Sequence, residues 1–159
     1  MEDRAGEANR SSASRAHLAP ASSTGQSAPV SSETPYAMLG GRERVLRLAQ
    51  RFYDLMEEHE PELTATHELD DQGKVCQRSR ERFGLFLVGW LGGPQDYMQQ
   101  HGHPRLRMRH RAVPIDTAMA EAWIRSMGRA MDDVGVEGEV RTFLDSRFAE
   151  VAMFLRNQA

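Results

Sequence analysis

The residues best suited to chemistry in this 159-residue chain are concentrated in one short segment, from His101 to Arg111. Its eleven positions hold three histidines and four arginines. Imidazole nitrogens bind metals and exchange protons near neutral pH, and guanidinium groups bind carboxylates and phosphates. The segment therefore predicts a binding function unless it is simply a solvated basic loop.

Three kinds of site compete with the solvated loop. His101, His103 and His110 could hold zinc, but no cysteine or well-spaced carboxylate completes such a set. The arginines could bind nucleic acid, but the segment lacks aromatic side chains on which bases stack. One histidine could instead ligate the metal of a buried cofactor whose acidic groups the arginines neutralise, and haem, with its two propionates, has this chemistry. The composition of the segment leaves these alternatives open.

The composition of the whole chain narrows the class of protein. Twenty basic and 23 acidic residues give a formal net charge of −3, so no global field draws the chain to nucleic acid or to an acidic membrane. No apolar run approaches the ~18 residues that span a bilayer. The single cysteine, Cys76, excludes an internal disulfide. We expect a soluble cytoplasmic protein without a membrane or nucleic-acid partner.

Residues 1–35 differ from the rest of the chain. They are rich in serine, alanine and proline and contain no aromatic residue. Such a segment cannot bury enough apolar area to offset the entropy lost on ordering. We predict a disordered extension over 1–35 and one folded domain over 36–159.

The folded domain has the apolar spacing of helices. Residues at i, i+3 and i+4 form an apolar stripe in each of four segments. Glycine or proline stands near their ends. The spacing predicts an all-α domain with four principal helices, at about 42–58, 75–91, 116–134 and 137–156.

Two connecting segments are less regular. We expect residues 62–74 to be irregular, and residues 94–113 to contain one or two short helical turns. Arg105 to Arg109 alternate in polarity, which is typical of a strand, but a lone strand would have no partner here. We therefore expect no strand.

Several runs of residues, taken together, resemble a group II truncated haemoglobin. The similarity covers about residues 36–157, and its parts are weak singly but specific in this order and spacing. The matching parts are Arg51-Phe52-Tyr53, the run from Phe86 to Pro94, Tyr97, the run from His101 to His110, Pro114-Ile115 and the run from Ala122 to Met127.

The resemblance implies a fold and a cofactor. The fold would be the two-over-two helical sandwich of truncated globins, with the four helices as its B, E, G and H helices. The cofactor would be haem b, which binds oxygen and other diatomic ligands such as NO and CO.

The resemblance also implies roles for single residues. His110 matches the proximal histidine that ligates the iron. Tyr53 and Trp123 match distal residues that donate hydrogen bonds to the bound gas, and His67 falls near the remaining distal position. Ser79 takes the place of the usual distal histidine.

Further residues would surround the cofactor. Arg82, Tyr97, Arg107 and Arg109 are candidates for the haem edge, where arginine would pair with propionate. The predicted pocket wall consists of Phe52, Phe83, Phe86, Leu87, Met108, Met119 and Met127. Val113 stands where the family often has an aromatic residue.

These roles predict a globin that releases oxygen slowly, because several donors would act in a dry pocket. Oxygen binding or transport, scavenging and redox chemistry are the expected functions. Nitric oxide dioxygenase or peroxidase-like activity would need an external reductase. We expect a monomer or a homodimer. The alternative is a haem-free helical interaction or sensory domain that retains the globin fold.

Overall fold

A computed structural model describes residues 33–159 of the chain. The predicted extension lies outside the described residues except for its last three positions. The described part contains eight helices and no strand beyond an isolated bridge between Leu69 and Val75, which confirms the all-α prediction. The helices are α1 Pro35–Leu39, α2 Arg42–His59, α3 Pro61–Thr64, α4 Gln77–Trp90, α5 Asp96–His101, α6 Leu106–Arg109, α7 Thr117–Val134 and α8 Gly138–Phe154.

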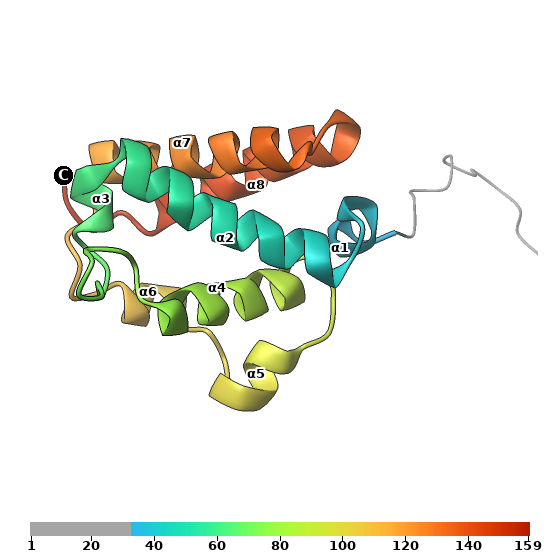
Figure 1. The fold of residues 1–159 in the computed structure, drawn as a ribbon, viewed down its shortest axis with the longest axis horizontal. Coiled ribbons are helices and arrows are strands. Elements are labelled where there is room, and N and C mark those ends of the chain that lie inside the picture. Colours follow the sequence, from blue (N-terminus) through green and yellow to red (C-terminus); the bar gives the residue numbers. More distant parts are fainter. Residues whose placement is uncertain (1–32) are drawn as a thin grey trace, which may run out of the picture. The chain divides into compact units, whose positions relative to one another are not determined.

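The four long helices form two layers (Figure 1). Helix α2 packs on α4 in one layer and on α7 of the other, and α7 packs on α8. The core lies where the layers meet. Helix α2 contributes a buried stripe at the spacing of a helical turn, Val45, Leu48, Ala49, Phe52, Tyr53 and Met56.

The ends of α7 follow the residue chemistry that predicted them. The side chain of Asp116 accepts a hydrogen bond from the backbone N–H of Met119 at 2.8 Å, as a helix N-cap does. Gly135 ends the helix in the left-handed conformation, with φ of 81°.

The segment between α2 and α4 differs from the prediction at both ends. Helix α3 occupies positions expected to be irregular, because Pro61 suits a first helical turn and Thr64 donates to the Met56 carbonyl at 3.1 Å. Helix α4 begins two residues later than predicted. The Val75 N–H donates instead to Glu57, at 2.9 Å, so the chain is still extended there.

The connector from α4 to α7 contains the two short helices α5 and α6, as expected. The alternating residues Arg105 to Arg109 belong mostly to α6 and form no strand. Arg105 precedes α6 in the left-handed conformation, with φ of 46°.

Candidate functional site

One cavity, of about 330 Å³, lies among α2, α4, α7, α8 and the segment around α6. Aromatic and aliphatic side chains form most of its wall, and a few polar groups converge on it, as in a cofactor pocket. Nine of the ten side chains predicted for the site line it: Tyr53, His67, Arg82, Phe83, Phe86, Tyr97, Arg109, His110 and Trp123.

His110 follows α6 and enters the cavity wall with a defined tautomer. Its Nδ1 lies 2.7 Å from the Leu106 carbonyl oxygen. A carbonyl oxygen only accepts, so Nδ1 carries the proton and the lone pair is on Nε2. A histidine held in this way is prepared to ligate a metal through Nε2.

The segment after His110 is fixed by a residue from the far end of the chain. The Asn157 side-chain amide donates to the carbonyls of His110 and Val113, at 3.3 and 2.9 Å. Its oxygen accepts from the Ile115 N–H at 2.8 Å. The sequence had no signal for this role, because Asn157 lies beyond the last helix and its partners are more than 40 positions away.

Tyr53 and Trp123 provide hydrogen-bond donors in the cavity wall. Within residues 33–159, no protein acceptor binds the Tyr53 hydroxyl or the Trp123 indole N–H, and both residues line the cavity. Burial raises the pKa of Tyr53, so its hydroxyl keeps its proton at physiological pH. The Phe52 ring contacts both rings, each with a centroid distance of 5.1 Å.

His67 lies beside Tyr53 but presents different chemistry from that expected. Its Nδ1 lies 3.0 Å from the Leu63 carbonyl and therefore carries the proton. Burial lowers the pKa of the ring, which stays neutral. Its Nε2 is then an acceptor. His67 can accept a hydrogen bond from a water molecule in the cavity, and donation falls to Tyr53 and Trp123.

Arg82 provides a test of whether the cavity suits an acidic cofactor. Its Nε is buried and lacks a hydrogen-bond partner in the described structure. A buried unpaired cationic donor is costly, and a carboxylate from a bound group would satisfy it. Arg109 also lines the cavity, with its guanidinium 5.8 Å from the Tyr97 ring centroid. A histidine with its Nε2 uncommitted and an arginine whose buried Nε lacks a hydrogen-bond partner, in one apolar cavity, fit haem.

Other predicted residues lie away from the cavity. The Arg107 guanidinium lies over the Phe154 ring, 4.8 Å from its centroid, and not in the cavity wall. Met108, predicted as wall, is 66% exposed. Leu87 and Met127, also predicted as wall, are buried in the core and do not line the cavity.

The structure also bears on the zinc alternative. Among the described residues, no three histidine, cysteine or acidic side chains are grouped to hold a metal ion. His103 accepts instead from the backbone N–H of Arg105, at 3.2 Å, and His101 packs on Tyr97. The three histidines of the basic segment are not brought together.

Part of the cavity wall was not predictable from the sequence. The missed residues are mainly small or aliphatic, and a core residue and a wall residue of that type look alike in a sequence. They are Leu63, Thr66, Leu106, Ile115, Ala120, Val151, Ala152 and Leu155.

No helix of residues 33–159 is long and apolar enough to cross a membrane.

Comparisons with known proteins agree with this architecture. The family model of bacterial-like globins matches residues 34–157. The group 2 truncated haemoglobin YjbI of Bacillus subtilis is 38% identical over 124 residues, which cover 78% of this chain and 89% of that protein.

Solved structures show the same similarity. A cold-adapted truncated haemoglobin from Pseudoalteromonas haloplanktis superposes with a TM-score of 0.73 at 36% identity, covering 80% of this chain and all of that one. A truncated oxygen-avid haemoglobin from Bacillus subtilis gives 0.71 at 37% identity, covering 79% and 100%. Membership of this family implies a haem cofactor and small diatomic ligands such as oxygen. The chain therefore belongs to the group II truncated haemoglobins, within the family of bacterial-like globins.

Proposed function

We propose that the chain holds haem b in this cavity, with His110 as the protein ligand of the iron, and reversibly binds oxygen, NO or CO. The observation that carries the proposal is the His110 ring, which donates from Nδ1 to Leu106 and lines the cavity with Nε2 free to ligate. Arg82 supports it, because its buried Nε lacks a partner that a propionate would supply.

The protein's own contribution is the set of side chains that hydrogen-bond to a bound gas. Haem, when bound, supplies an iron atom that takes a diatomic ligand. Tyr53 and Trp123 supply uncommitted hydrogen-bond donors, and the neutral His67 supplies an acceptor for a water molecule in the cavity. Donors already in place in a pocket that excludes water stabilise partial negative charge strongly.

These donors favour slow release of oxygen. A solved relative is described as oxygen-avid, which agrees with that expectation. A globin that holds oxygen tightly is suited to scavenging or redox chemistry more than to delivery. We therefore propose nitric oxide dioxygenase or peroxidase-like turnover as its enzymatic role, with electrons from an external reductase.

Haem uptake tests the proposal directly. The purified full-length chain is titrated with haemin, reduced, and exposed to oxygen and to carbon monoxide. We expect one haem per chain and a Soret band that shifts with each ligand. His110→Ala should weaken or abolish this spectrum, because the iron loses its protein ligand.

His103→Ala is the matched control, since it removes an exposed histidine from the same segment and should leave the spectrum unchanged. A folded wild-type chain that takes up no stoichiometric haem would contradict the proposal. That result would favour the haem-free interaction or sensory domain instead.

A further inference from the structure

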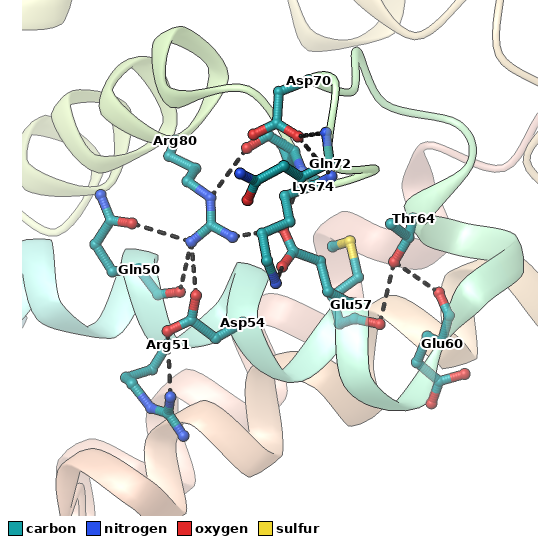
Figure 2. A network of polar contacts seen from close by, with 12 residues as sticks. Gln50, Arg51, Asp54, Glu57, Glu60, Thr64, Asp70, Gln72, Lys74 and Arg80 are labelled. Atoms are coloured by element: carbon teal, nitrogen blue, oxygen red, sulfur yellow. Dashed lines mark hydrogen bonds and ion pairs between the residues drawn. The ribbon is translucent and has the colours of Figure 1, made fainter.

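Arg80 stands apart from every other charged residue of the described chain. Within residues 33–159 it alone among them is buried, with 8% of its surface exposed. Its guanidinium donates to the Val75 carbonyl at 3.2 Å, to Asp54 at 2.7 Å and to Glu57. Figure 2 shows this guanidinium between α4 and α2, with Gln50 as a further acceptor at 3.1 Å.

The acceptors of Arg80 lie along two successive turns of α2. Gln50, Asp54 and Glu57 lie three positions before, one after and four after Tyr53. These offsets put the acceptors along the part of the helix that carries Tyr53. Arg80 therefore fixes the position of α4 relative to this part of α2.

The same network holds the loop between His67 and α4. Glu57 accepts from the Val75 N–H at 2.9 Å and from the Lys74 ammonium at 3.3 Å. Asp70 accepts from the backbone N–H of Lys74 at 3.0 Å, which closes the turn. Figure 2 shows how these contacts join the loop to α2.

Arg80 also touches the distal site directly. Its guanidinium carbon lies 5.5 Å from the centre of the Tyr53 ring. The other sides of that ring meet His67 and Phe83 edge-on, with centroid distances of 5.7 and 5.5 Å. The cation thus helps to enclose the ring whose hydroxyl belongs to the cavity.

We propose that Arg80 is a positioning residue that acts through Tyr53, fixing the Tyr53 hydroxyl in the cavity and thereby slowing release of the bound gas. This inference rests on the proposed haem function. A buried ion pair adds little stability over a well-packed apolar residue of similar size, whereas its several directed bonds restrict geometry. The main contribution of Arg80 is therefore to fix the position of Tyr53, and not to stabilise the fold.

The test compares Arg80→Met, Tyr53→Phe and the double variant in the full-length, haem-loaded chain. The measurements are the oxygen dissociation rate and the infrared stretching band of carbon monoxide on the reduced protein, which reports donors near the gas. Tyr53→Phe should raise the dissociation rate about tenfold, the effect of losing one strong hydrogen bond. Arg80→Met should raise it by about three- to tenfold and shift the carbon monoxide band in the same direction.

The double variant separates positioning from general support of the fold. If Arg80 acts through Tyr53, adding Arg80→Met to Tyr53→Phe should change the rate by less than about twofold. An Arg80→Met effect that persists in full without the Tyr53 hydroxyl would overturn the proposal. So would an unchanged rate and band in an Arg80→Met protein that binds one haem.

Arg51→Met is the matched control. Arg51 also binds Asp54, at 3.1 Å, but from the more exposed side of α2. Its loss should leave the carbon monoxide band in place and the rate within about twofold. An equal effect from Arg51→Met would show that the charge of Asp54 matters and not the position of Tyr53.

Arg80→Lys decides the question if Arg80→Met does not fold. Lysine keeps the charge but lacks the planar fork that reaches several acceptors at once. A smaller shift of the band in the same direction supports the proposal, and wild-type values for Arg80→Lys contradict it. A wild-type chain without haem overturns the proposed function, and this inference with it, so the two failures are distinguishable.

Discussion

At the scale of single residues, the chemistry of the site depends on which atom of each side chain is already committed. His110 and His67 both donate from Nδ1 to the carbonyl four positions earlier, so each presents Nε2. Tyr53 and Trp123 keep their donors uncommitted to protein in the described chain. The resemblance placed His67 near these two donors, and its hydrogen bond to the Leu63 carbonyl makes it an acceptor.

Arg82 allows a prediction at this scale. In Arg82→Met, the haem-loaded protein should form with His110 still in place but should lose haemin about tenfold faster, because one charge-assisted bond is missing. The measurement is haemin transfer to excess apomyoglobin, followed by absorbance.

Arg78→Met is the comparison, because Arg78 lies one turn earlier on α4 and is exposed and paired with Glu68. We expect Arg78→Met to keep the wild-type rate. Equal rates for wild type and Arg82→Met would show that the buried Nε does not meet the cofactor.

At the scale of elements, the glycines of the turn after α4 allow α1 to pack closely against that turn. Helix α4 ends at Trp90, and Gly92 then has φ of 98°, which favours glycine. The next residue, Gly93, has no room for a side chain. A Cβ there would lie 2.6 Å from the Tyr36 ring and 2.8 Å from the Val88 carbonyl oxygen.

Two glycine substitutions should therefore have opposite effects. Gly93→Ala should destabilise the fold by about 1–3 kcal/mol, the usual cost of overpacking. Gly128→Ala, inside α7, should stabilise it by about 0.5–1 kcal/mol, since alanine is the better helix former. The nearest atom to a Cβ at Gly128 lies 4.0 Å away.

Urea unfolding of both haem-free variants, followed by circular dichroism, measures these effects. If the urea midpoint of Gly93→Ala equals or exceeds that of Gly128→Ala, the turn accommodates the added methyl group at little cost in stability. The close packing of α1 on the turn would then be unimportant for stability.

At the scale of the whole domain, ion pairs tie the two helical layers together beyond their apolar contact. Glu60, at the end of α2, accepts from Arg125 at 2.9 Å and from Arg129 at 3.0 Å, both on α7. Farther along the same crossing, Arg51 binds Asp133 at 2.7 Å. The Glu60 pairs hold the end of α2, the helix that carries Tyr53, against α7, the helix that carries Trp123.

Glu60 makes this tie sensitive to acid. Hydrogen bonds from Arg125 and Arg129 outweigh burial and hold the pKa of Glu60 below its ordinary value of 4.5. A lowered pKa in the folded state stabilises the fold above the ordinary pKa, and the contribution disappears as pH falls through the folded-state value.

In Glu60→Gln, the melting temperature at pH 7 should fall by about 2–4 °C, as expected for loss of about 1 kcal/mol of largely exposed pairing. This difference from wild type should shrink steadily below about pH 4.5. Thermal melts of the haem-free protein across this pH range test it. A difference that stays constant with pH would mean that the charge of Glu60 contributes nothing.

Much of the fold was predictable because its signals are local. The stripe of α2, the Asp116 cap and the Gly135 stop each involve residues within a few positions of one another. Apolar period, capping and chain breaking act at that range. The late start of α4 was not predictable, because the partner that holds Val75 is Glu57, 18 positions earlier.

The candidate site also has residues that local sequence could predict and residues that it could not. Cavity residues such as His110 and Trp123 could be predicted, because the motifs around them resemble those of group II truncated haemoglobins. Arg80 and Asn157 were not, because Asp54 and Glu57 read as ordinary charges of a helix surface, and Asn157 as a polar chain end. Burial and the direction of a side chain depend on partners far away in the chain, whereas the acceptor role of His67 follows from the Leu63 carbonyl only four positions earlier. Local sequence therefore determined the helices, whereas packing between the layers determined the cavity and the network around Tyr53.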